Sequence, residues 1–137
     1  MTSGAGRPWP AWPAGDRALV QIADRLRHAV RPTDLVARFA GEEFVCLLPD
    51  TDADVAGEIA ERLRAMLSGN PLAIAEGRQV SVTASAGVAG ATGGSGAVVL
   101  ENAGRALHRA KETGRDRTVI AEGWPPIAGR IGGSVLN

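Results

Sequence analysis

The chain has 137 residues, and its 15 basic and 15 acidic side chains cancel to a formal net charge of zero. This length predicts one domain with a sizeable core, and the balanced charge gives no general attraction to nucleic acid or to an anionic membrane surface. The single cysteine excludes an internal disulfide framework and favours a reducing cytoplasm, while no apolar run is long enough to span a bilayer. We therefore expect a cytoplasmic protein with neither nucleic acid nor membrane as partner.

Residues 1–14 are rich in proline, tryptophan and small residues and show neither a helix nor a strand period. This composition predicts an extended or disordered leader. From Asp16 onward, apolar residues recur at the spacing of one helix face. The spacing predicts an amphipathic helix that Asp16 caps and that ends before Pro32.

Residues 34–49 place two apolar runs on either side of Ala40-Gly41-Glu42-Glu43. Runs rich in β-branched and aromatic residues around a short linker with glycine predict an antiparallel hairpin with its acids at the tip. Adjacent carboxylates repel each other, and a cation bound between Glu42 and Glu43 would relieve that repulsion. An ordinary solvated turn explains the two residues equally well. Cys46, in the second run, is predicted to be a core residue and not a nucleophile.

Periodicity and turn residues predict the remaining elements. A helix follows Asp52, and its apolar face extends to Leu67. The segments after it are a strand at Arg78–Ala89, a flexible loop at Gly90–Gly96, a third helix that stops at Gly114, a short strand at Thr118–Ala121, and a mobile tail at residues 122–137. Lys111, Arg115 and Arg117 lie at the end of the third helix, where cations interact favourably with the last carbonyls.

Several motifs, taken together and in order, resemble those of the GGDEF domain, the diguanylate cyclase family. Arg38-Phe39-Ala40-Gly41-Glu42-Glu43-Phe44 is similar to the family's signature turn, with alanine for its first glycine and glutamate for aspartate. Gly15-Asp16 resembles the family's helix start, and Ser85-Ala86-Gly87-Val88-Ala89 resembles its Ser-Ile-Gly-Val-Ala strand end. Residues 106–117 resemble Ala-Leu-Tyr-x-Ala-Lys-x-x-Gly-Arg-Asn-Arg, with His108 for tyrosine and Asp116 for asparagine. The resemblance covers residues 15–121, which we take as a partial GGDEF domain.

The resemblance implies an α/β fold: an α+β sandwich of the ferredoxin-like, nucleotidyl-cyclase palm type whose sheet contains antiparallel strands. It also implies an enzyme that condenses two GTP molecules into cyclic di-GMP. In the family each 3′-hydroxyl attacks the α-phosphate of the other nucleotide at the face between two domains, so catalysis requires a homodimer.

The resemblance assigns roles residue by residue. Glu42 and Glu43 would be the catalytic residues that bind Mg²⁺ or Mn²⁺, which neutralises phosphate charge and helps to deprotonate the hydroxyl. Gly41 would let the backbone approach the nucleotide, because glycine has no Cβ. Asp16 would accept hydrogen bonds from guanine, and Lys111 and Arg115 would hold the β- and γ-phosphates.

Arg31-Pro32-Thr33-Asp34 resembles the family's Arg-x-x-Asp site for inhibition by the product, cyclic di-GMP. Arginine suits such a site because its planar guanidinium pairs with both a phosphate and a guanine edge, while Asp34 holds it in place. Arg62, in the second predicted helix, is a candidate second arginine. The alternative is ordinary helix-end and surface charge.

The family's first strand, which carries a metal-binding aspartate, and the adjoining helix have no counterpart in this sequence. In the palm fold that strand lies between the hairpin and the strand predicted at Arg78–Ala89. Its absence predicts two sheet pieces with unpaired inner edges, and hence a marginal fold or a strand borrowed from elsewhere. Three hypotheses stay open: a weak or inactive diguanylate cyclase domain, a non-catalytic cyclic di-GMP-binding module, and a truncated fragment with little function of its own.

Overall fold

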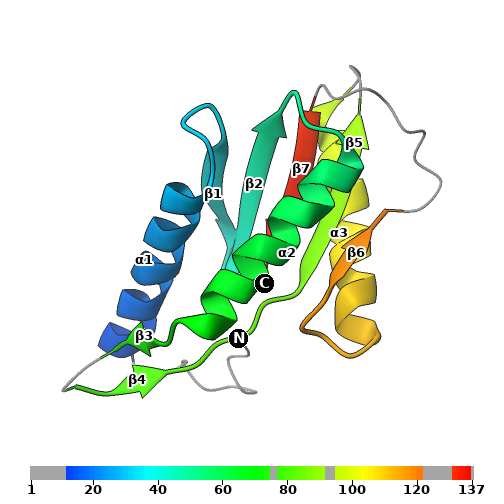
Figure 1. Cartoon of the computed structure of the whole chain (residues 1–137). Helices are drawn as coiled ribbons and strands as arrows, with labels where there is room; N and C mark the ends of the chain where they lie inside the picture. The colour runs from blue at the N-terminus through cyan, green and yellow to red at the C-terminus, as the bar shows by residue number, and fades with distance from the viewer. Residues whose placement is uncertain (1–11, 75–76, 92–94, 122–130, 137) are drawn as a thin grey trace.

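The computed structural model describes residues 12–74, 77–91, 95–121 and 131–136. Their elements are, in order, α1 (Trp12–Ala29), β1 (Leu35–Ala40), β2 (Glu43–Pro49), α2 (Ala53–Gly69), β3 (Leu72–Ala73), β4 (Gln79–Val80), β5 (Ala86–Ala91), α3 (Gly96–Glu112), β6 (Thr118–Ile120) and β7 (Ile131–Leu136). One five-stranded sheet has the order β1-β2-β7-β5-β6, and β3 pairs with β4 separately. Figure 1 shows α1 and α2 on one face of the large sheet and α3 on the other. The predicted α/β fold with an antiparallel-containing sheet is confirmed.

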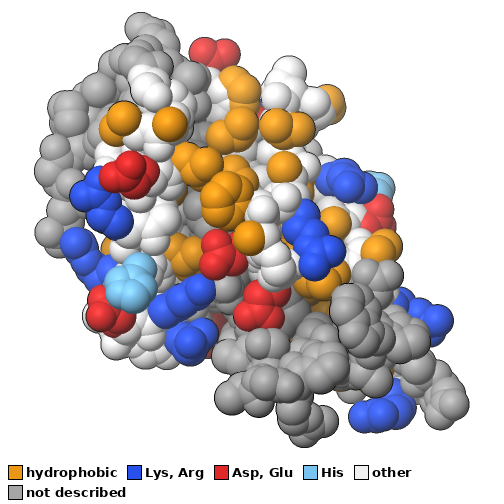
Figure 2. Space-filling view, turned by 180° about the vertical axis from the view of Figure 1, so that it is seen from behind, with side chains coloured by type: hydrophobic (Ala, Val, Ile, Leu, Met, Phe, Trp, Pro, Cys, Tyr) orange, Lys and Arg blue, Asp and Glu red, His pale blue; other side chains and the backbone are white. Residues whose placement is uncertain are grey.

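Two apolar layers enclose the large sheet. Because side chains alternate along a strand, Phe44, Cys46 and Leu48 of β2 pack with α1 and α2, whereas Val45 packs with α3. The α3 layer does not reach the edge strand β1, where Leu35 is 55% exposed. Figure 2 shows the face opposite to that of Figure 1, with hydrophobic side chains gathered in its middle and acidic and basic ones beside them.

The helices differ from the predicted ones mainly at the N-terminus. α1 begins at Trp12, so the predicted leader is wrong over its last residues, 12–14, and the predicted N-cap at Asp16 is wrong because this residue lies inside the helix. Residues 1–11 lie outside the described part of the chain. α2 begins as predicted, since Asp52 is its N-cap and accepts a hydrogen bond from the Val55 amide at 2.9 Å.

The hairpin prediction is confirmed. β1 and β2 are antiparallel, and Ala40 pairs with Glu43 across a linker of two residues. Gly41 has a φ of +49°, in the left-handed region that glycine enters without the steric cost of a Cβ. Ala40 is not among the described residues with positive φ, so its substitution for glycine causes no strain of that kind.

The strand predicted at Arg78–Ala89 is divided in two. β4 pairs with the short β3, and β5 begins only at Ala86, where it runs parallel to β6. The alternating pattern still marks the buried face, because Val82 and Ala84 between the two strands belong to the core. β5 continues to Ala91, so the loop predicted from Gly90 is wrong over its first two residues.

The C-terminal segment is the main correction to the predicted fold. Residues 122–130 of the predicted tail lie outside the described part of the chain, but Ile131–Leu136 forms β7. β7 is antiparallel to both neighbours, with Ser134 opposite Cys46 of β2 and opposite Val88 of β5. The prediction of two unpaired inner edges is therefore wrong, because β7 joins the two sheet pieces. The strand comes from the chain's own C-terminal region.

Candidate functional site

The tip of the β1–β2 hairpin lies beside the end of α3. Glu43 begins β2 and shares a strand face with Val45, the face that α3 covers, and its Oε2 lies 3.6 Å from Nζ of Lys111. The side chains of Lys111 and Glu43 are 24% and 32% exposed, and Glu42 is also half-buried. The turn itself is held by a hydrogen bond of 2.6 Å from Arg38 Nε to the carbonyl of Gly41. The structure thus brings together Gly41, Glu42, Glu43 and Lys111.

The donor set at this tip fits a magnesium-type cation. Mg²⁺ is usually bound by one or two carboxylates together with water and substrate phosphates, and two adjacent glutamates supply that number of carboxylates. Within the described residues there is no group of three or more His, Cys, Asp or Glu side chains that would hold a metal by itself. A cation held by Glu42 and Glu43 would therefore depend on oxygen ligands from a nucleotide or water.

Arg115 lies in a turn with an unusual backbone, directly after α3. Gly114, Arg115 and Asp116 have φ values of +127°, +61° and +47°. The left-handed conformation costs a non-glycine residue about 1–2 kcal/mol, so neighbouring contacts must hold this turn in place. The amide of Arg115 donates to the carbonyl of Ala110 at 2.9 Å, and that of Asp116 donates to Oγ of Ser85 at 3.1 Å. The turn therefore fixes the backbone position of Arg115, and with it the base of the Arg115 side chain.

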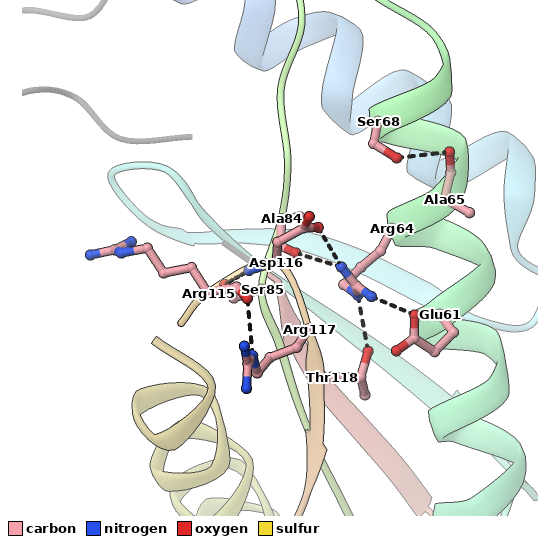
Figure 3. Close-up of polar contacts among 10 residues, drawn as sticks. All are labelled: Glu61, Arg64, Ala65, Ser68, Ala84, Ser85, Arg115, Asp116, Arg117 and Thr118. Atoms are coloured by element: carbon pink, nitrogen blue, oxygen red, sulfur yellow. Dashed lines mark hydrogen bonds and ion pairs between the residues drawn. The ribbon is translucent and has the colours of Figure 1, made fainter. Parts of the chain in front are cut away.

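Arg64 of α2, which is not among the site residues predicted from the sequence, forms an ion pair with the carboxylate of this turn. Its side chain is 13% exposed, and its guanidinium lies 2.7 Å from Asp116 and 2.6 Å from Glu61 (Figure 3). A sequence signal for it exists, because Arg64 stands one turn after Ala60 and next to Leu63, in the buried stripe of α2. A charged residue in such a stripe usually has a specific partner.

Asp16 lies in α1, and its side chain is outside those the structure describes. One turn further along α1, Leu19 lines a cavity of about 190 Å³ between this helix and the hairpin. Val36 and Phe44 contribute apolar walls to the cavity, and Arg38 lines it as well. This cavity could not be predicted from the sequence, because the apolar faces of the helix and the hairpin meet only in the folded chain.

Arg31 and Asp34 form a compact pair. Asp34 accepts hydrogen bonds from the Arg31 amide at 2.9 Å, from Nε at 3.2 Å and from Nη2 at 3.0 Å. Nη2 also donates to the carbonyl of Pro49 and to the hydroxyl of Thr51, both at 2.8 Å. The hydrogen bond to Asp34 raises the pKa of Arg31 above its ordinary value, so the guanidinium stays charged. Asp34, whose side chain is 2% exposed, thus fixes the orientation of Arg31.

Arg62 lines the same pocket as Arg31 and Asp34. Arg31, Asp34 and Arg62 all line a pocket of about 490 Å³, together with Asp50, Asp52 and Glu58. The two guanidinium groups come from different elements, one from the segment before β1 and the other from α2. The three residues that the Arg-x-x-Asp resemblance selected are thus neighbours in the structure.

Cys46 lies in the core, as predicted. Its side chain is fully buried, and burial, with a smaller contribution from the negative charge of Asp34, raises the pKa of the thiol to about 12. A thiol that stays protonated at neutral pH is a poor nucleophile. Cys46 therefore serves packing.

The comparison with known families and proteins agrees with these motifs. The family described as "Diguanylate cyclase, GGDEF domain" matches residues 12–117. The chain is 45% identical over 109 residues to diguanylate cyclase DgcP of Pseudomonas aeruginosa, a match that covers 79% of this chain and 16% of the relative. It is 43% identical over 109 residues to response regulator PleD of Caulobacter vibrioides, covering 77% of this chain and 24% of the relative. The chain thus spans less than a third of either relative's length.

Solved structures show the same fold. The GGDEF domain of DgcB from Caulobacter crescentus, solved in complex with c-di-GMP, superposes with a TM-score of 0.74 at 30% identity, covering 84% of this chain and 68% of that one. Diguanylate cyclase SiaD of Pseudomonas aeruginosa, solved with its activator SiaC, gives a TM-score of 0.74 at 38% identity, covering 82% and 43% of the two chains. None of the helices in the described residues has the length and apolar character needed to cross a membrane.

Proposed function

Because this chain belongs to the GGDEF family of diguanylate cyclase domains, we propose that it binds GTP and contributes one half-site to the condensation of two GTP molecules into cyclic di-GMP. That reaction comprises two transfers, and in each the 3′-oxygen of one nucleotide bonds to the α-phosphorus of the other, the bond from that phosphorus to pyrophosphate breaks, and the hydroxyl proton passes to solvent. The observation that carries the proposal is the ion pair between Glu43 and Lys111, because it joins the signature turn to the motif at the end of α3.

The roles within this half-site follow from charge and position. Glu42 and Glu43 would hold Mg²⁺ or Mn²⁺, the class of cation on which diguanylate cyclases depend, and the metal would neutralise phosphate charge. Lys111 lies in the last turn of α3 and Arg115 in the turn directly after it, and the two would bind the β- and γ-phosphates. Gly41 leaves room at the turn for the nucleotide, since a Cβ there would have no neighbour within 4 Å.

The guanine base would enter the cavity between α1 and the hairpin. The apolar side chains of Leu19 and Phe44 suit the faces of a purine, and Arg38 at the same cavity offers hydrogen-bond donors. Asp16, one turn before Leu19 on α1, would accept from the edge of the base.

A second copy of the chain would supply the other half-site. Glu43, Val45 and Leu47 share the sheet face on which Leu35 is exposed, so the acidic tip and the exposed apolar side chain lie on one side of the sheet. Two such faces in contact would bury that side chain and bring two bound nucleotides together.

We expect slow turnover. β7 lies between β2 and β5, the position that the resemblance gives to the family's first strand with its metal-binding aspartate. Its sequence, Ile-Gly-Gly-Ser-Val-Leu, contains no carboxylate side chain. A metal site with fewer anionic ligands binds its cation more weakly.

Incubation with GTP and Mg²⁺, followed by chromatography of the nucleotides, tests the enzymatic proposal. We expect a small amount of cyclic di-GMP from the wild type, none from Glu43→Gln, and an unchanged amount from the matched control Glu101→Gln, which alters an exposed ion pair on α3. Absence of product at high protein concentration would overturn the cyclase proposal for this chain.

A second candidate function is binding of cyclic di-GMP without catalysis. The observation in its favour is the pocket that collects Arg31, Asp34 and Arg62. Calorimetry with cyclic di-GMP should give measurable heat for the wild type and for Arg105→Ala, an exposed arginine on α3, but not for Arg31→Ala. Equal binding by Arg31→Ala would contradict this function. A chain that neither makes nor binds the dinucleotide would fit the third hypothesis, a fragment with little activity of its own.

A further inference from the structure

Arg64 joins three segments of the chain that are distant in sequence. Its Nη1 donates to Asp116 at 2.7 Å and to the carbonyl of Ala84 at 3.3 Å, and its Nε donates to Oγ1 of Thr118 at 3.2 Å. Its Nη2 donates to Glu61, one turn earlier on α2, at 2.6 Å. All three guanidinium nitrogens thus donate hydrogen bonds, and the side chain is 13% exposed. This arrangement holds α2, the segment before β5 and the turn after α3 in fixed relative positions.

The turn that Arg64 contacts is the one with two successive left-handed non-glycine residues, Arg115 and Asp116. Ser85, which is 2% exposed, accepts from the amide of Asp116, and Arg117 donates from Nε to the carbonyl of Arg115 at 3.1 Å. Arg64 adds the only ion pair to the turn's carboxylate among the described residues. In Figure 3 the side chain of Arg115 points away from Arg64, toward the opposite side of the turn.

We infer that Arg64 is a positioning residue for the phosphate-binding cation Arg115, and that it acts through Asp116. This inference rests on the proposed binding of GTP. The side chain of Asp116 is 58% exposed, and this residue adjoins Arg115 in sequence, so without a partner its carboxylate would attract the Arg115 guanidinium and repel the phosphates. Arg64 neutralises that carboxylate and holds the turn. Asp116 stands where the family motif has asparagine, and Arg64 thus compensates the negative charge that this substitution adds.

A double-mutant cycle tests the inference, with the dissociation constants of GTP and guanosine measured in the presence of Mg²⁺. Arg64→Met should weaken GTP binding about tenfold and leave guanosine binding unchanged, because only GTP has phosphates for Arg115 to bind. Asp116→Asn should have little effect alone and, combined with Arg64→Met, should restore most of the affinity. Arg105→Met, which removes an exposed arginine of α3, is the matched control and should bind GTP like the wild type.

The outcomes separate positioning from a purely structural role. If Arg64→Met lowers the melting temperature but the folded protein binds GTP with unchanged affinity, the inference is overturned. It is also overturned if Asp116→Asn restores no affinity. Should Arg64→Met fail to fold, Arg64→Lys retains the charge with fewer donors and should give an intermediate affinity for GTP, and wild-type affinity in that variant would contradict the inference.

A readout without nucleotide distinguishes this inference from the proposed function. Hydrogen exchange at the amides of Arg115 and Asp116, both hydrogen-bonded in the structure, should accelerate in Arg64→Met and not in Arg105→Met. A wild type that binds no GTP would overturn the proposed function, and faster exchange would then still support the positioning of the turn by Arg64. Unchanged exchange would overturn the positioning itself.

Discussion

Nζ of Lys111 lies 3.6 Å from Oε2 of Glu43, so the last turn of α3 is joined by an ion pair to the first residue of β2. Both side chains are partly buried, and their attraction is less screened by water than that of a fully exposed pair. The residue proposed for the phosphates and one of those proposed for the metal are therefore neighbours before any nucleotide binds.

Lys111 is the only lysine in the chain, which makes it easy to probe. We expect GTP with Mg²⁺ to slow acylation of its amine, because the phosphates would cover Nζ, and we expect Lys111→Met to weaken GTP binding about tenfold through the loss of a charge-assisted contact. Mass spectrometry of the labelled peptide gives the first result and calorimetry the second. Equal labelling with and without saturating GTP would contradict the assigned role.

Gly87 is required where β5 meets α3. A Cβ on Gly87 would lie 2.2 Å from the carbonyl oxygen of Ala103 and 2.2 Å from the amide nitrogen of Leu107, and both are backbone atoms that cannot rotate away. We expect Gly87→Ala to lower the free energy of unfolding by about 1–3 kcal/mol, measured by urea denaturation. Gly104→Ala is the matched control, since a Cβ there has no neighbour within 4 Å. It should stabilise α3 by about 0.5–1 kcal/mol, and an equal loss in both variants would contradict the steric reason.

Elements with strong local signals could be predicted from the sequence. The hairpin follows from two β-rich runs around Gly41, and the start of α2 follows from the capping oxygen of Asp52. The start of α1 could not be located, because the prolines around Trp12 gave no period and Asp16 looked like a better cap. Local signals thus gave the presence of these elements more reliably than their ends.

Features that depend on distant segments could not be predicted. Gly132 and Gly133 of β7 lack the alternation and β-branching of a strand, and their backbone is held by pairing with β2 and β5. Similarly, Arg64 and Asp116 are 52 positions apart, and only the fold makes them partners. In the candidate site, the motif resemblance selected Glu43 and Lys111 but gave no information on the contacts that support them.

The central strand β7 should be essential for cooperative folding. Proline at position 134 would remove a backbone N–H from a strand that is paired on both sides, so we expect Ser134→Pro to lower the free energy of unfolding by about 1–3 kcal/mol. Ser134→Ala keeps the N–H and is the control. Urea denaturation and light scattering should show an early transition and self-association for the proline variant, because β2 and β5 would expose unpaired edges. Equal stability of the two variants would show that β7 is not needed.

We expect the free energy of unfolding to fall in alkali, because the thiol of Cys46 is buried. Its pKa rises from an ordinary value of 9.0 to about 12 in the folded protein, because burial disfavours the thiolate. Between these two values the unfolded chain has released the proton and the folded protein has kept it, so the unfolded state binds fewer protons and stability must fall as the pH rises. The slope should reach about 1.4 kcal/mol per pH unit above pH 9 and fade near pH 12, and below pH 9 this thiol should contribute no slope.

Urea denaturation at several pH values measures that slope, and the absence of tyrosine keeps phenol ionisation from obscuring it. Cys46→Ala is the informative variant, because it removes the titrating thiol from a fully buried position. It should be less stable than the wild type at pH 7, through the space it leaves in the core, but should lose stability less steeply above pH 9. Parallel curves for the two proteins across this range would show that the thiol ionises as easily in the folded chain as in the unfolded one, and would contradict its burial.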